Sequence, residues 1–296
     1  MSAEAIRFVR RDSEISIAYG ITPSAASTNS TSVVLLHGLA SNMTRWSEFV
    51  ARTSITNSHP LIRVDLRGHG QSVTRTHFDL ETWSDDLVAI LDHEQLHNAV
   101  IVGHSLGAQA ALMFARRHPN RTRGLVLIDP VFRPALSPQW QRRAKWSPLI
   151  AMSAGLVRCF NRSGVYRRNV PTLDLAELDR QARIALLDAQ SKAAFIEQYS
   201  STRADLKTIP HANYLQDMVE MFREVPAVSS IHVPTLAILS TGATFASTER
   251  MGDALAALPS CAIKLIACEH WPLTEKPTEV REMIEQWIEA TFPLHQ

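Results

Sequence analysis

Gly103-His104-Ser105-Leu106-Gly107 follows a short apolar run at residues 99–102 and opens a segment with a helical pattern. A serine between two glycines, at a sharp turn from a strand into a helix, is typical of a catalytic nucleophile. Such a turn strains the backbone of the serine, and the glycines keep side chains out of the crowded space around it. The Gly-x-Ser-x-Gly pattern alone also occurs by chance, but the strand before it and the helix after it are the context that this chemistry requires. We therefore predict that Ser105 is a nucleophile at the carboxyl edge of a sheet, rather than an ordinary buried turn serine.

Short apolar runs alternate with longer helical patterns along the chain, and this alternation indicates parallel β-α-β units. The pattern predicts strands at residues 14–19, 32–36, 61–65, 99–103, 124–128, 234–239 and 262–267. Between them, apolar residues recur at intervals of three and four, at Leu80, Trp83, Leu87 and Leu91. This spacing predicts a helix whose apolar face covers the sheet. A last helix is expected to begin at Pro277, since proline suits a first helical turn.

The pattern changes after Asp129. Prolines stand at positions 130, 134 and 138, and the chain from Trp140 to about Val228 is mostly helical in pattern, with no convincing strand. Strand and helix alternation resumes at Pro234. We therefore expect an α/β core in two parts, residues 1–133 and 229–296, with an inserted helical cap at residues 134–228.

The charge and cysteine content exclude several classes of function. The net charge is +1 and no block of five or six like charges occurs, so we expect no nucleic-acid partner. The pairs Arg142-Arg143 and Arg167-Arg168 are interpreted as solvated faces. Three cysteines without metal-ligand spacing cannot all pair, which favours a reducing compartment and no metal site. No apolar stretch has the length of a signal peptide or a membrane span, so we expect a cytoplasmic protein without a membrane partner.

A serine hydroxyl is a poor nucleophile at neutral pH and needs a base within hydrogen-bond reach. His270 lies just beyond the last expected strand, in Glu269-His270-Trp271-Pro272. In a parallel sheet this position falls on the same carboxyl edge as Ser105. We predict that His270 is the base, with a surface histidine as the alternative interpretation.

Further motifs resemble those of the α/β-hydrolase fold superfamily. They are Leu36-His37-Gly38-Leu39, the segment Asp65-Leu66-Arg67-Gly68-His69-Gly70-Gln71-Ser72, the turn at Ser105, and His270 with Glu275 and Pro277 behind it. The resemblance covers about residues 14–134 and 231–296. It implies an open, mostly parallel eight-stranded sheet with helices on both faces, a helical cap after the sixth strand, and a pocket between cap and core.

The resemblance also implies an oxyanion hole, formed by the backbone N–H groups of Leu39 and Leu106. Acyl transfer places negative charge on the former carbonyl oxygen, and two preset donors stabilise that charge. His37 and Gly38 then shape the loop, and His69 and His104 are expected to be structural. No metal and no organic cofactor is expected.

The acid departs from the superfamily's common pattern. Members most often place an aspartate in the turn after the seventh strand, but residues 240–245 contain no carboxylate. Glu249 lies too far along the chain, and Glu269 is directly adjacent to the base. Asp129 ends the sixth expected strand, and some superfamily members, including certain haloalkane dehalogenases and lactone hydrolases, take their acid from that strand. We predict Asp129, with a structural aspartate at the cap hinge as the alternative.

A serine at this turn disfavours haloalkane dehalogenase and epoxide hydrolase chemistry, because members of those groups carry an aspartate there. A serine with a base and an oxyanion hole suits acyl transfer. The sequence therefore favours a serine hydrolase of small or medium apolar carboxylic esters or lactones. The alternatives are a carbon–carbon bond hydrolase, a cofactor-free haloperoxidase, an acyltransferase, and a ligand-binding receptor of this fold with little turnover.

Substrate preference is expected to depend on the cap. Trp140 and Trp146 are candidates for lining an apolar pocket, and Trp271 is a candidate because it adjoins the expected base. Packing within the cap explains the first two equally well, and Trp271 could equally anchor its own loop.

Overall fold

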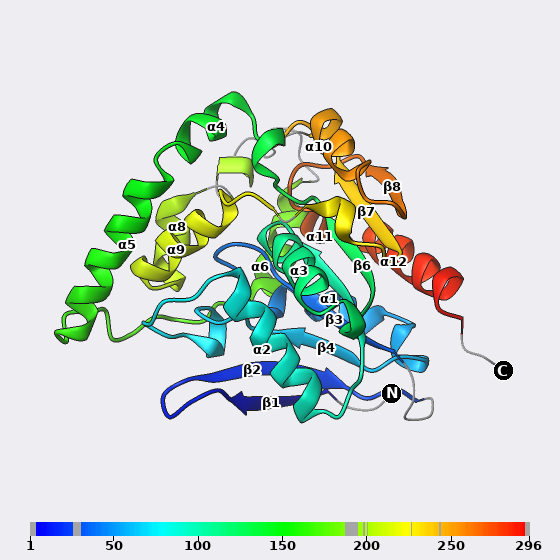
Figure 1. Ribbon diagram of the computed structural model, residues 1–296, viewed down its shortest axis with the longest axis horizontal. Coiled ribbons are helices and arrows are strands. Elements are labelled where there is room, and N and C mark those ends of the chain that lie inside the picture. The colour runs from blue at the N-terminus through cyan, green and yellow to red at the C-terminus, as the bar shows by residue number, and fades with distance from the viewer. Residues whose placement is uncertain are drawn as a thin grey trace.

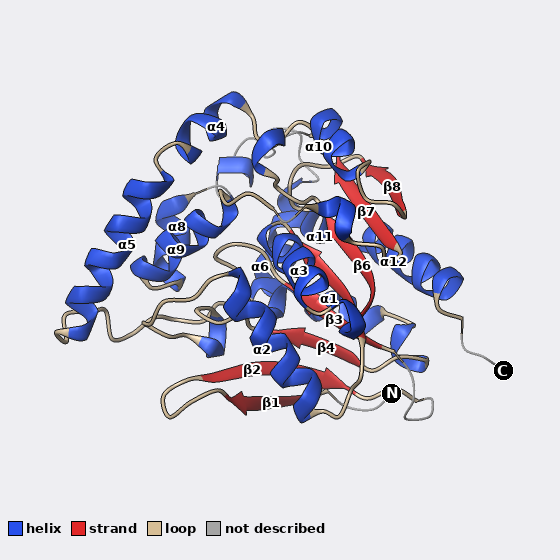
Figure 2. Cartoon of the chain, viewed as in Figure 1, coloured by secondary structure: helices blue, strands red, loops and turns tan. Residues whose placement is uncertain are grey.

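The computed structural model describes residues 4–25, 31–186, 195–197, 199, 201–225, 227–242 and 244–293. Its centre is an eight-stranded sheet in the order β1-β2-β4-β3-β5-β6-β7-β8. The strands are β1 Ala5–Arg10, β2 Ser16–Thr22, β3 Ser32–Leu36, β4 Leu61–Val64, β5 Ala99–His104, β6 Thr122–Ile128, β7 Thr235–Ser240 and β8 Cys261–Ile266. Both pairings of β2 are antiparallel, and all pairings from β4 to β8 are parallel. The expected mostly parallel eight-stranded sheet is confirmed (Figure 2).

The strand β1 was not expected from the sequence. Its residues are mostly exposed, and Arg7 and Arg10 interrupt its apolar run. An edge strand that buries little apolar surface leaves only a weak pattern, which explains the omission. By contrast, every residue of β3, β5 and β7 is buried, as is typical of parallel strands with helices on both faces.

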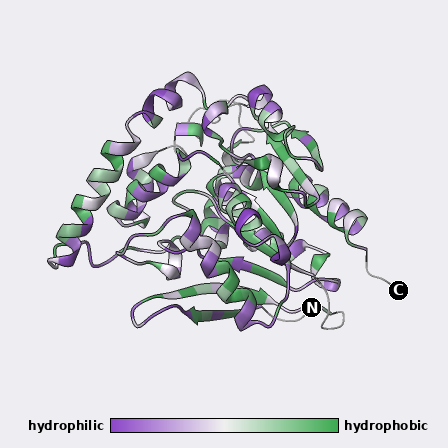
Figure 3. Cartoon of the chain, viewed as in Figure 1, coloured by the Kyte–Doolittle hydropathy of each residue, from purple (hydrophilic) through white to green (hydrophobic). Residues whose placement is uncertain are grey.

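Two apolar cores lie on opposite faces of the sheet, because successive side chains of a strand point to opposite sides. Val34 of β3 packs in the core covered by α2 (Leu80–His93), α3 (Leu106–Arg117) and α10 (Thr248–Leu255). Val33 packs in the other core, which is covered by α1 (Ser47–Arg52) and α12 (Pro277–Thr291). The strands are mostly coloured as hydrophobic in Figure 3.

The expected helices are present. The predicted apolar face of α2 is buried at Leu80, Trp83, Leu87 and Leu91, and α12 begins at Pro277. The Asp79 carboxylate caps α2 by accepting a hydrogen bond from the backbone N–H of Thr82 at 2.7 Å. Short 3₁₀ turns occur at Met43–Trp46, Ile55–Asn57, Gly70–Ser72, Pro119–Arg121, Arg133–Ala135 and Val228–Ser230.

Helices fill the described part of the chain between β6 and β7. They are α4 (Pro138–Ala144), α5 (Ser147–Arg162), α6 (Leu175–Leu186), α8 (Thr202–Thr208) and α9 (His211–Met221), and α11 (Pro272–Glu275) follows β8. The helices α5, α8 and α9 lie together to one side of the sheet, with α5 outermost (Figure 1). Cap boundaries at residues 134 and 228 stay a prediction. Among the described residues, no helix combines the length and apolar character needed to cross a membrane.

Candidate active site

Ser105 occupies the turn between β5 and α3 in a strained backbone conformation. Its φ of 55° and ψ of −118° place a residue with a side chain in a region that usually favours glycine. A Cβ atom at Gly107 would lie 2.5 Å from the carbonyl oxygen of His37, and one at Gly103 would collide with the backbone of Gly107. Both flanking positions therefore require glycine for the helix to approach the sheet this closely.

His270 lies beside the Ser105 hydroxyl. It follows β8, and its Nε2 atom lies 2.9 Å from Ser105 Oγ. The other ring nitrogen, Nδ1, forms a short hydrogen bond with Asp129 Oδ2. The structure thus brings together Ser105, Asp129 and His270 from the ends of β5, β6 and β8. Because Nδ1 faces a carboxylate, it carries the proton in this arrangement, and Nε2 is free to accept the proton of Ser105.

Asp129 is held as a carboxylate by the end of β7. Its Oδ1 accepts hydrogen bonds from the backbone N–H of Ser240 at 2.9 Å and from the Ser240 hydroxyl at 2.8 Å. Burial alone would raise the pKa of Asp129, but the facing His270 and the bonds from Ser240 lower the pKa below its usual value. Ser240 was not found by sequence reasoning. Its contribution depends on the alignment of β6 with β7, and the only signal was a serine at the end of the strand after which the resemblance led us to expect the acid.

The predicted oxyanion loop lies against the nucleophile. A Cβ atom at Gly38 would lie 3.3 Å from Ser105 Cβ, so the backbone before Leu39 passes close to the serine. The other predicted donor, Leu106, begins α3 directly after Ser105. His37 shapes this loop: its Nδ1–H donates to the Gly38 carbonyl at 2.8 Å, and its Nε2 accepts from the Leu66 N–H at 3.1 Å.

The remaining buried histidines near the site are engaged elsewhere. Burial and the neighbouring His69 hold the pKa of His37 well below its usual value, so its imidazole is neutral. His104 Nε2–H donates to the His270 carbonyl at 3.0 Å, and burial lowers the pKa of His104 to about 3. His69 pairs with Asp217 of α9 at 2.8 Å. The expectation that these side chains are structural agrees with their contacts.

Ser105 and His270 open into a cavity of about 440 Å³. Its wall is largely apolar and includes Trp140 and Trp271, two of the three tryptophans expected to contact substrate. Trp146 does not line this cavity. It precedes α5 and is 61% exposed, so the structure gives its expected substrate contact no support, and that contact stays a prediction.

Comparison with known proteins identifies the family. Residues 33–283 match the model of the Alpha/beta hydrolase family. The chain belongs to this family. Among curated relatives, this α/β hydrolase is 24% identical over 272 residues to esterase YbfF of Escherichia coli, which covers 88% of the chain and 94% of the relative. It is 26% identical over 195 residues to 2-hydroxymuconate semialdehyde hydrolase of Pseudomonas sp., over 60% of the chain and 66% of that relative.

Solved structures of similar fold cover almost all of this α/β hydrolase. An esterase from Thermogutta terrifontis superposes with a TM-score of 0.68 at 20% identity, covering 98% of this chain and 99% of that one. Est816, described as an N-acyl homoserine lactone degrading enzyme, superposes with a TM-score of 0.66 at 21% identity, covering 95% and 100%. At these identities, the superpositions show the shared fold.

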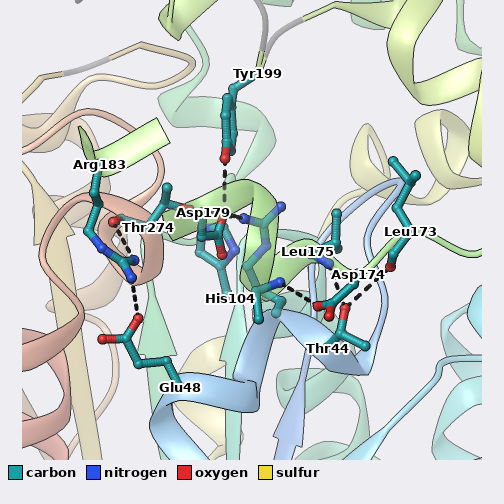
Figure 4. Close-up of polar contacts among 12 residues, drawn as sticks. Thr44, Glu48, His104, Leu173, Asp174, Leu175, Asp179, Arg183, Tyr199 and Thr274 are labelled. Carbon is teal, nitrogen blue, oxygen red and sulfur yellow. Dashed lines mark hydrogen bonds and ion pairs between the residues drawn. The ribbon is translucent and has the colours of Figure 1, made fainter. Parts of the chain in front are cut away.

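A polar network joins α6 to the core of the α/β hydrolase beside the cavity (Figure 4). Asp179 of α6 pairs with Arg45, and it accepts hydrogen bonds from the hydroxyls of Thr274 at 2.9 Å and Tyr199 at 3.0 Å. Arg183 of α6 pairs with Glu48 in α1. Arg45 and Tyr199 both line the cavity, so the network fixes one polar part of its wall. Sequence reasoning did not find this network, since its members lie far apart along the chain.

Proposed function

We propose that this α/β hydrolase is a serine hydrolase that cleaves small or medium apolar carboxylic esters or lactones through an acyl-enzyme intermediate. The observation that carries the proposal is the hydrogen-bonded series Ser105 Oγ, His270 Nε2, His270 Nδ1 and Asp129 Oδ2, which opens into an apolar cavity. This is the arrangement of nucleophile, base and orienting acid that acyl transfer requires. The similarity to proteins described as esterases and as a lactone-degrading enzyme supports the same reaction class.

Each residue has one role in the proposed reaction. His270 Nε2 takes the proton of Ser105 as Oγ attacks the carbonyl carbon of the substrate, and the backbone N–H groups of Leu39 and Leu106 receive the negative oxygen. When the tetrahedral intermediate collapses, His270 gives the proton to the leaving alcohol. Water then attacks the acyl-enzyme with His270 again as the base, and Ser105 is released. Asp129 stays ionised throughout and stabilises the imidazolium.

The first test is the hydrolysis of a series of short-chain p-nitrophenyl esters. We expect Ser105→Ala and Asp129→Asn each to lower kcat by about a thousandfold or more. Ser153, which is exposed, and Asp85, whose side chain is 48% exposed, provide matched controls, and Ser153→Ala and Asp85→Asn should retain wild-type activity. Circular dichroism checks that all four variants fold. An unimpaired Asp129→Asn variant would refute the proposed acid while leaving the nucleophile in place.

A carbon–carbon bond hydrolase is the second candidate. The match to 2-hydroxymuconate semialdehyde hydrolase favours it. The assay offers 2-hydroxymuconate semialdehyde and follows the loss of its absorbance, with Ser105→Ala as the control. Faster turnover of this compound than of every ester would replace the first proposal with the second. Inertness toward both, with a folded protein, would favour a ligand-binding receptor.

A further inference from the structure

The outer cap helix α5 exposes a continuous apolar face. Its members recur at intervals of three and four residues, which places them on one side of the helix. Trp146, which directly precedes α5, is 61% exposed. The other members of the face are Leu149 (47% exposed), Met152 (65%), Leu156 (59%) and Phe160 (53%). Single exposed apolar side chains are common on protein surfaces, but a contiguous exposed apolar face usually marks an interaction site.

The opposite side of α5 is occupied by the rest of the molecule. Ala154 is fully buried, α5 packs against α9, and Arg158 donates a hydrogen bond to Gln216 of α9 at 3.1 Å. The ribbon shows α5 along the outer margin of the cap, with α8 and α9 between it and the rest of the molecule (Figure 1). The apolar face therefore points away from the protein and forms a ridge rather than a groove.

The segment of the chain that carries this face has only basic charged residues. Residues 130–173 contain eight of the 30 Lys and Arg residues of the chain and none of its 29 Asp and Glu residues. Arg142 and Lys145 precede α5, and Arg162 and Arg168 stand at and beyond its end; all four are exposed. Within the described part of the chain, none of these four forms an ion pair with a carboxylate. Free cations thus stand at both ends of the apolar ridge.

We propose that the apolar face of α5 binds the surface of an anionic lipid bilayer. An amphipathic helix with cations beside its apolar side lies in the plane of the interface, with its apolar side chains below the headgroups and its cations among the lipid phosphates. Sixteen residues give α5 a length of about 24 Å, enough to place both basic ends on one surface. Peripheral binding of this kind needs no spanning segment, and it does not depend on the proposed ester hydrolysis.

Charge favours lipid over a second copy of the chain. In a two-fold dimer through this face, the basic ends of one α5 would meet the α5 of the second copy. That helix also carries basic residues and no acidic ones, so repulsion between like charges would oppose association. The cytoplasmic leaflet of cell membranes is negative and attracts basic segments. The ridge shape also fits a surface into which side chains can insert.

Binding through α5 would bring the cavity rim close to the lipid. Beyond the helix, Arg167 donates hydrogen bonds to the carbonyl oxygens of Leu206 at 2.7 Å and Ile209 at 3.1 Å, which ties this end of α5 to α8. Pro171, which follows in the chain, and Lys207 of α8 are both exposed and both line the cavity. An apolar substrate dissolved in the membrane would then have a short path to Ser105.

The test is co-sedimentation of the full chain with sucrose-loaded vesicles, made either of phosphatidylcholine alone or with about one third phosphatidylglycerol. We expect binding to the anionic vesicles, little binding to the neutral ones, and release when NaCl rises from about 0.05 M to about 0.5 M. The double substitution Met152→Ser/Leu156→Ser should weaken binding at least about tenfold. Arg142→Gln/Lys145→Gln should also weaken binding and reduce its dependence on salt.

The matched control is Ile184→Ser, which removes a side chain of α6 that is 58% exposed and should leave binding unchanged. Circular dichroism of every variant checks folding, which these exposed positions should preserve. The proposal is overturned if anionic vesicles do not bind the wild type at low salt, or if Met152→Ser/Leu156→Ser binds as well as the wild type. It is also overturned if size-exclusion chromatography shows a dimer that this double substitution dissociates, since a second copy would then cover the face.

Discussion

At the scale of single residues, the positions of His270 and Asp129 depend on hydrogen bonds from neighbouring side chains. His104 fixes the His270 backbone through its carbonyl, and Ser240 fixes the carboxylate of Asp129 with two hydrogen bonds. His104 lines the cavity beside Ser105, whereas Ser240 does not. Ser240 therefore acts through Asp129 and the base, so its removal should change the rate of the chemical step more than the affinity for substrate.

Ser240→Ala tests this positioning role. The Asp129 carboxylate would keep the bond from the backbone N–H of residue 240 and lose the bond from the hydroxyl. A hydrogen bond to a charged group contributes about 1.5–3 kcal/mol, so we expect kcat for a p-nitrophenyl ester to fall about tenfold or more, with KM nearly unchanged. Ser240→Thr keeps the hydroxyl and should recover most of the lost rate. If Ser240→Ala raised KM alone, a role in substrate binding would replace the positioning role.

At the scale of secondary-structure elements, stability depends on how helices begin. The Asp79 carboxylate accepts hydrogen bonds from the N–H and the hydroxyl of Thr82 at the start of α2. We expect Asp79→Ala to lower the free energy of unfolding by about 1 kcal/mol, measured by urea denaturation at pH 7. Glu289→Ala, at an exposed position of α12, is the control and should change this free energy by less than about 0.5 kcal/mol.

The contribution of Asp79 should also depend on pH. Burial alone would raise its pKa, but the bonds from Thr82 lower it below the usual value of 3.8. A carboxyl whose pKa is lower in the folded state stabilises the fold fully above its unfolded pKa, and loses that contribution as the pH falls through the folded pKa. The difference between wild type and Asp79→Ala should therefore be constant from pH 7 to about pH 5 and shrink below about pH 3.8. A difference that grew in acid would contradict this assignment.

Helices with one buried face and strands that are buried throughout could be predicted from the sequence. The strands β3, β5 and β7 are buried throughout, and their unbroken apolar runs revealed them, whereas the edge strand β1 left no clear pattern. Asp129 could be predicted beside His270, since the carboxyl ends of neighbouring parallel strands meet at one edge. The outward direction of Trp146 could not be predicted, because it depends on how α5 packs against α9.

At the scale of the whole molecule, one buried pair joins α9, a helix of the expected cap, to the loop after β4. His69 lies in the loop after β4 and Asp217 lies in α9; their side chains are only 1% and 0% exposed, and their atoms approach to 2.8 Å. On the same helix, Asn213 donates hydrogen bonds to the carbonyl oxygens of Gly68 at 2.9 Å and Thr74 at 2.8 Å. These contacts hold α9, which contributes Met218 and Met221 to the cavity wall.

Removing one member of this pair should loosen the cap. Asp217→Ala would leave the His69 imidazole buried beside an empty space, and breaking a buried pair commonly costs about 3–5 kcal/mol. We expect a lower melting temperature, faster proteolysis within residues 134–228, and a higher KM for esters because the cavity wall is less ordered. Glu224→Ala, at a side chain that is 83% exposed, is the control and should match the wild type in all three measurements. A variant with normal KM and normal protease resistance would show that Asn213 and the apolar contacts alone hold the cap.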